Sequence, residues 1–110
     1  MGEEPISDEA VLDALEHLLA SAELEGSSRL QAFLRHIVLA RLAGNDRDLR
    51  AYAIGVDVFE RPADFDPQAE SLVRVEAGRL RQKLAAYYAG AGRSDPVRIS
   101  LPKGGYVPRF

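Results

Sequence analysis

Four cationic side chains lie within ten residues of one another in the C-terminal half of the chain: Arg74, Arg79, Arg81 and Lys83. In a helix, a rotation of about 100° per residue places Arg74 and Arg81 on one edge and the other two on the opposite edge. The residues between the two edges are small or uncharged: Val75, Gly78, Gln82 and Ala86. Such a ridge can enter the major groove of double-stranded DNA while the cations at its edges meet phosphates. The segment therefore predicts a DNA-binding helix.

Charge is distributed unevenly along the chain. Residues 1–70 carry fifteen Asp and Glu against six Arg, a net charge of −9, whereas residues 71–110 carry eight Lys and Arg against two acids, a net charge of +6. Because the local field at a contact surface governs encounter with a polyanion, the basic part favours nucleic acid although the whole chain is acidic. The plainer alternative is that the basic helix and the acidic residues 1–28 are ordinary solvated surfaces.

Other chemistry has little support in the sequence. His17 and His36 lie in different predicted helices without a companion at metal-ligand spacing, and the chain has no cysteine. Residues 102–105 lack the pattern of a phosphate-binding P-loop, and no serine lies in a nucleophile-elbow motif. We therefore expect a protein that is not an enzyme and that has no metal site and no cofactor.

Length and composition indicate one folded domain. The 110 residues are enough for a single modest core, and 46% hydrophobic with 28% charged residues is typical of globular proteins. No apolar run approaches the roughly 18–20 residues of a membrane helix. The N-terminal residues lack the basic start and apolar stretch of a secretion signal. The expectation is a cytoplasmic protein that does not contact a membrane.

Residues 7–43 are expected to form two N-terminal helices, preceded by a flexible arm at residues 1–6. Ser7 is suited to cap the first helix, since its hydroxyl can accept a hydrogen bond from a first-turn N–H. Apolar residues at helical spacing continue to about Ala22, and Gly26 then interrupts the chain.

The second N-terminal helix is predicted at residues 29–43. Ser28 and Gln31, three residues apart, match the capping-box pattern at its start. Gly44 is the residue expected at its C-terminal cap, because glycine tolerates the left-handed conformation found there.

Residues 46–89 are expected to form two further helices joined by a proline-containing loop at residues 60–70. Apolar residues at spacings of three and four favour a helix over the first part: Leu49, Tyr52, Val56 and Phe59. Residues 54–58 alternate and contain β-branched side chains, so a short strand is the alternative there. We expect Phe65 to plug the loop onto the core.

The helix that carries the four cations is expected to span residues 71–89. Its predicted buried side consists of apolar residues at helical spacing: Val73, Ala77, Leu80, Leu84, Tyr87 and Tyr88. Glycines at positions 90 and 92 are expected to end it.

A β-hairpin is predicted at residues 97–110. Residues 97–101 alternate with period two, and residues 106–110 can return antiparallel after a turn at residues 104–105. Pro108 would confine the second strand to an edge, because proline has no N–H to donate. The predicted fold class is therefore mainly α with a C-terminal β-hairpin.

The order of helices, loop, basic helix and hairpin is that of a winged helix-turn-helix with two helices packed on it, here in a single domain at residues 7–110. Residues 73–84, VRVEAGRLRQKL, resemble V-x-V-x-I-x-R-L-R-x-K-L, the recognition-helix signature of OmpR/PhoB-type response-regulator effector domains. The glycine and tyrosine at residues 105–106 resemble the close of that family's wing. Residues 58–59 are Val-Phe where that family has Val-Trp. The match covers residues 45–110.

Residues 28–110 also resemble a small winged-helix module at the N-termini of some bacterial proteins that carry TPR-repeat or adenylate-cyclase-type regions downstream. The matching tracts are F-L-x-x-I-V, Y-x-I-G-V-D-V-F-x-R-P-x-x-F-D-P and L-P-K-G-x-Y-V-P. Two helices stand where the response-regulator domains have an N-terminal four-stranded sheet. The sequence also shows no receiver domain, so control by phosphorylation is not implied.

The resemblance and the helix geometry together imply which residues would contact base edges. Arg79 is the leading candidate, because a guanidinium can donate two hydrogen bonds to guanine O6 and N7. Gln82 and Val75 are secondary candidates, and Gly78 would let the helix approach closely. Glu76 has two roles open: it can accept from cytosine N4 or orient a neighbouring arginine.

The remaining cations are expected to bind the DNA backbone. Those assigned to phosphates are Arg74, Arg81, Lys83, Arg98 and Arg109. Lys103, at the hairpin tip, would reach the backbone or the minor groove. Arg81 has a second role open, an ion pair with a carboxylate such as Asp57 or Asp64.

The function that these features predict is a sequence-specific double-stranded DNA-binding transcriptional regulator, with residues 71–89 in the major groove and residues 97–110 on the backbone or minor groove. Because one helix reads only a few base pairs, a homodimer or cooperative oligomer is expected. The alternative is an adaptor or anti-regulator that binds a protein partner through the acidic N-terminal helix. A single-strand or RNA binder is disfavoured, because the nearby tyrosines are needed for the core.

Overall fold

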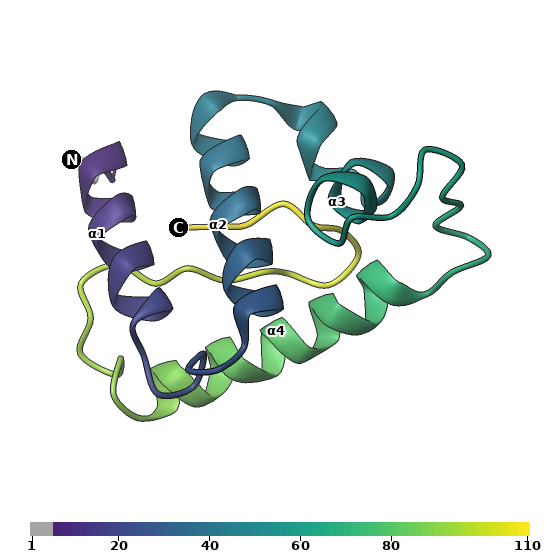
Figure 1. The fold of residues 1–110 in the computed structure, drawn as a ribbon. Helices are drawn as coiled ribbons and strands as arrows, with labels where there is room; N and C mark the ends of the chain where they lie inside the picture. The colour runs from purple at the N-terminus through teal and green to yellow at the C-terminus, as the bar shows by residue number, and fades with distance from the viewer. Residues whose placement is uncertain (1–5) are drawn as a thin grey trace.

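The computed structural model describes residues 6–110, so all of the predicted arm except Ile6 lies outside the described residues. Within them lie four α-helices and one 3₁₀ turn: α1 (Asp8–Leu19), α2 (Ser28–Ala43), η1 (Asp46–Leu49), α3 (Ala51–Asp57) and α4 (Leu72–Ala89). Figure 1 shows α1 and α2 side by side on the same side of α4, with α3 near the first turns of α4. The C-terminal segment, drawn in yellow, runs back across these helices.

The start of α1 confirms the predicted cap. The N–H of Ala10 donates to Ser7 Oγ at 3.1 Å, and Asp8 and Glu9 occupy the first turn, where the helix dipole favours negative charge. The helix ends at Leu19, earlier than the sequence indicated, and a run of turns and a bend follows it over residues 20–26.

The start of α2 corrects the predicted capping box. Its N-cap is Ser27, whose side chain makes no capping hydrogen bond, and Gln31 Nε2 donates to the Leu24 carbonyl oxygen at 2.8 Å. Gln31 therefore fastens the preceding turn instead of closing a box with Ser28. At the other end the prediction is confirmed, since Gly44 caps the helix in the left-handed conformation with φ of 74°.

The segment after α2 is helical, as favoured, but it is broken in two. Arg50 is extended, with ψ of 152°, and it separates η1 from α3. Gly55 of α3 lies against the ring of Phe65, where a methyl group would overlap that ring. This close approach lets Phe65, which is only 4% exposed, plug the loop onto the core, as predicted.

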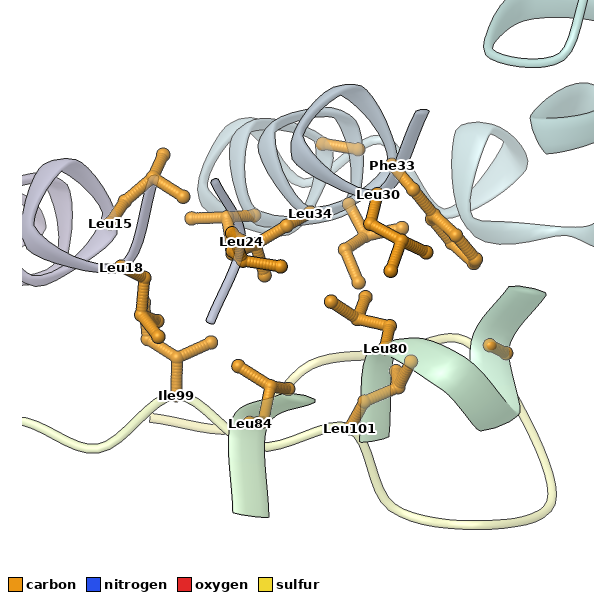
Figure 2. Packing of buried hydrophobic residues seen from close by; sticks show 14 of the residues in the cluster. Leu15, Leu18, Leu24, Leu30, Phe33, Leu34, Leu80, Leu84, Ile99 and Leu101 are labelled. Atoms are coloured by element: carbon orange, nitrogen blue, oxygen red, sulfur yellow. The ribbon is translucent and has the colours of Figure 1, made fainter. Parts of the chain in front are cut away.

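Side chains from all four helices and the C-terminal segment meet in one core. In Figure 2, Ile99 lies near Leu18 of α1 and Leu84 of α4, while Leu101 lies near Leu80. Full burial of one such side chain contributes roughly 1.5–3 kcal/mol. The C-terminal segment is therefore part of the folded body.

The predicted C-terminal β-hairpin, and with it the winged helix, is wrong. Residues 97–110 run out and return, but they are joined by a single isolated bridge, in which the backbones of Ser100 and Arg109 exchange hydrogen bonds of 2.9 and 2.8 Å. No sheet forms in residues 6–110, and the fold they adopt is all-helical. Residues 58–71 separate α3 from α4, close to the loop expected at residues 60–70 and many more residues than the three or four of a standard helix-turn-helix.

Backbone chemistry explains why the bridge does not extend. In an antiparallel register set by Ser100 and Arg109, the next hydrogen-bonded pair would be Pro102 with Val107. Pro102 has no N–H to donate, so the ladder stops there. Side chains of α4 instead bind backbone groups of this segment. The Ile99 N–H donates to the Tyr88 hydroxyl at 2.7 Å, and Arg81 binds three carbonyl groups.

Candidate nucleic-acid interface

The exposed side of α4 carries a narrow row of residues without charge. Val75 is 46% exposed, Gln82 and Ala86 are exposed, and Gly78 is partly exposed. We call these four residues the crest. The opposite side of α4 is buried, with the six apolar residues that the spacing predicted, because they face α2, α3 and the C-terminal segment. The crest can approach a partner surface closely, since none of its side chains is long and charged.

On one side of the crest, α4 and the start of α2 enclose a hollow of about 390 Å³. We call it the α2-side hollow. Its cations are Arg79 and Lys83 from α4 and Arg29 from α2. The other lining residues are Gly26, Ser27, Ser28, Leu30, Glu76 and Gln82. No local sequence pattern pointed to Arg29, because only folding brings the first turn of α2 beside α4.

A buried carboxylate holds one of these cations. Glu76 is 4% exposed, and its Oε1 lies 3.1 Å from Nη1 of Arg79, one helical turn further along α4. The Arg79 side chain is itself 65% exposed. Of the two roles left open for Glu76, the geometry matches the orientation of a neighbouring arginine. Arg29, across the hollow, lies over the ring of Phe59 with its guanidinium carbon 5.6 Å from the ring centre.

On the other side of the crest lies a second hollow, of about 430 Å³, between α4 and the C-terminal turn. We call it the C-terminal hollow. It is lined by Arg74, Arg81, Lys103, Gly104, Gly105 and Tyr106. Lys103 is exposed at the turn, and Arg74 is exposed on α4. These two cations face the same hollow although 29 positions separate them in the chain.

Arg81 is committed to the fold of the C-terminal turn. Its Nε donates to the carbonyl oxygen of Leu101 at 2.8 Å, and its Nη2 donates to those of Pro102 at 3.2 Å and Gly105 at 2.9 Å. The guanidinium therefore binds backbone carbonyls, not the carboxylates of Asp57 or Asp64 that the sequence suggested as partners.

The two remaining predicted cations lie on the C-terminal segment. Arg98 stacks over the Tyr88 ring, with its guanidinium carbon 5.2 Å from the ring centre, and lines a groove along the last turns of α4. Arg109 shares a shallow depression with Lys103 and Val107. Val107 is 49% exposed. Arg98 and Arg109 therefore flank Lys103 without lining either of the two hollows beside the crest.

Two tyrosines near the C-terminal end of α4 form hydrogen bonds to the segment that follows the helix. Burial and a hydrogen bond from its hydroxyl to Asp95 raise the pKa of Tyr87 to about 12. Burial also raises the pKa of Tyr88, although the hydrogen bond from the Ile99 N–H works in the opposite direction. Both rings lie in the core and contact each other edge to face, so they are not available to stack on bases.

Residues 6–110 contain no group of three or more His, Cys, Asp or Glu side chains placed to hold a metal ion. His36 instead makes a 2.8 Å contact from Nε2 to the carbonyl oxygen of Asp48. None of the helices in this part of the chain has both the length and the apolar character needed to cross a membrane.

Comparison with known proteins finds no matching family model, no significantly similar curated protein and no significantly similar solved structure. The resemblance to response-regulator effector domains therefore depends only on the sequence patterns that suggested it.

Proposed function

We propose that this chain binds double-stranded DNA in a sequence-dependent way, as a transcriptional regulator, through the crest of α4. The observation that carries the proposal is the pair of basic hollows on opposite sides of an uncharged crest. Cations beside a helix meet phosphates, whereas residues on its outermost side meet base edges.

The dimensions of helix and groove are compatible. An α-helix with its side chains is about 10–12 Å across, and the major groove of B-DNA is about 12 Å wide. A crest with a glycine and short side chains reduces the outer radius of α4 on that side. The charged flanks then lie at the level of the phosphates, one hollow toward each strand.

The proposed roles differ from those that the sequence suggested. Val75 and Gln82 lie on the crest and are the base contacts, to a thymine methyl group and to adenine N6 and N7 respectively. Arg79 reaches guanine from the edge of the crest. Phosphate contacts come from the exposed cations of the two hollows, Arg29, Arg74, Lys83 and Lys103. Arg81 supports the site by holding the turn that presents Lys103.

A binding experiment with one cation removed from each flank tests the proposal. Duplexes would first be selected from a random pool and then titrated by fluorescence anisotropy at about 50 and 200 mM salt, a range over which phosphate contacts weaken strongly. The double variant Arg74→Ala with Lys83→Ala should bind roughly tenfold more weakly, with a salt slope shallower by roughly two.

The chain offers a matched control. Arg41 in the last turn of α2 and Arg47 in η1 are exposed cations at the end of α2 that lies away from α4 (Figure 1). Replacing both by alanine removes the same charge and should leave the salt slope unchanged. Wild-type protein that selects no duplex, or equal losses in the two double variants, would contradict the proposal.

A further inference from the structure

The buried carboxylate on α4 is unusual for its position. Glu76 is the one charged residue that is fully buried in the part of the chain that the structure describes. Removing a carboxylate from water is costly unless the charge is paired. Its partner in the described residues is Arg79, through the single 3.1 Å contact. The pair therefore joins a fixed, buried carboxylate to a guanidinium that reaches the surface.

Burial excludes one of the two roles that the sequence left open. Glu76 lines the α2-side hollow, but with its side chain only 5% exposed it presents almost no surface to a base edge. The contact leaves the Nε and Nη2 edge of Arg79 without a partner among residues 6–110. That edge carries two N–H groups that can donate hydrogen bonds to guanine O6 and N7.

We propose that Glu76 is a positioning residue that fixes Arg79 for the recognition of guanine. This inference rests on the proposed DNA-binding function. A long arginine side chain normally loses rotational freedom when it binds, and an arginine already held by a buried carboxylate loses less. The same contact also lowers the freedom of Arg79 to move to a phosphate, so it favours a base contact over a backbone contact.

The decisive variants remove the charge of Glu76 without changing its size. Glu76→Gln and Glu76→Met both preserve the side-chain length, and the methionine variant leaves no buried polar group that needs a partner. Both should lose roughly three- to tenfold of the discrimination between guanine and other bases at one position, which is part of the roughly five- to 150-fold discrimination that a bidentate contact supplies. Their binding to non-specific duplex should stay equal or increase, since Arg79 is free to meet phosphates.

Two further variants separate positioning from a structural role. Arg79→Lys keeps the positive charge beside Glu76 but removes the planar guanidinium group that can donate two hydrogen bonds to guanine. Guanine discrimination should therefore fall while the salt slope stays constant. In the Arg79→Lys background, Glu76→Met should change discrimination no further. A merely structural Glu76 would alter the melting temperature of the variants but not the selected bases.

The outcomes distinguish the two proposals. Wild-type protein without salt-dependent duplex binding would contradict the DNA-binding function itself. Wild-type protein that binds DNA, with unchanged base selection in both Glu76 variants, would contradict only the positioning role. Folding of each variant is checked by circular dichroism, and if Glu76→Gln does not fold, the methionine variant decides the question.

Discussion

The two flanks of α4 contain the same kinds of side chain but use them differently. On the C-terminal flank, Arg81 is hydrogen-bonded to carbonyl groups of residues 101–105 and attaches that segment to the helix. On the α2 flank, Lys83 projects into a hollow and makes no ion pair within residues 6–110. Cations two residues apart on one helix can thus have unrelated roles, and their spacing alone does not tell which is which.

The largest effect is expected for Arg81→Met. The variant keeps the apolar part of the side chain but removes the donors to three carbonyl groups. One of these carbonyl groups belongs to Leu101, which is buried. Hydrogen bonds from a charged group are strong, so the free energy of unfolding should fall by about 2–3 kcal/mol in urea denaturation. Arg74→Met is the matched control, because Arg74 is exposed on the same flank, and its effect should stay within about 0.5 kcal/mol. Equal losses in the two variants would show that the carbonyl contacts of Arg81 do not stabilise the fold.

The second prediction concerns the other fastening of the C-terminal segment, between Tyr87 and Asp95. Because the pKa of Tyr87 is raised from 10.0 to about 12, its contribution to stability is complete below pH 10. Between pH 10 and 12 the unfolded chain loses the proton first, so the contribution declines as the pH rises. Tyr87→Phe should cost about 1–1.5 kcal/mol at neutral pH through the lost hydrogen bond.

The comparison of wild type with Tyr87→Phe across pH isolates this residue from the other tyrosines, which titrate in both proteins. The difference in unfolding free energy between the two should shrink by about 1–2 kcal/mol from pH 10 to pH 12. A difference that is constant over this range would mean that the folded state does not hold the Tyr87 proton.

The helices of this fold could be predicted from the sequence because their signals are local. Ser7, Gly44 and the apolar spacing of α4 each act within one or two turns of the chain, and each was confirmed. The predicted hairpin was wrong for a reason that was visible in the sequence. Pro102 falls at a position that must donate once Ser100 pairs with Arg109, but the register itself was not known in advance.

The candidate site could be predicted only in part. Helical geometry correctly separated the crest of α4 from its flanks, because that relation is fixed within one element. The contribution of Arg29, the buried state of Glu76 and the carbonyl contacts of Arg81 all depend on which element packs beside α4. The hollow brings together residues up to 50 positions apart (Arg29 and Arg79), so no local pattern encodes their placement.

The third prediction compares exposed cations on the two flanks. Lys83→Gln and Lys103→Gln should each leave the free energy of unfolding within about 0.5 kcal/mol of wild type, because both side chains are exposed. Each should weaken duplex binding by a few fold for all sequences and reduce the salt slope by about one. Arg41→Gln, at the far end of α2, provides the control. A loss for only one of the two lysines would restrict the DNA contact to a single flank.

The smallest effect is expected from the acidic face of α1, and it separates DNA binding from the alternative of a protein-binding module. Asp13 and Glu16 are exposed, and Glu16 makes only a surface ion pair with Arg35 at 3.6 Å. The double variant Asp13→Lys with Glu16→Lys should therefore change the free energy of unfolding by less than about 1 kcal/mol. Acidic charges that lie away from the crest repel DNA only through solvent, where screening acts over about 8 Å at physiological salt. The double variant should therefore bind duplexes up to about threefold more tightly at low salt and equally at about 150 mM. A gain in duplex affinity that persists at high salt would place α1 against the DNA. Loss of binding to a protein partner, with unchanged duplex binding, would instead support the alternative of a protein-binding module.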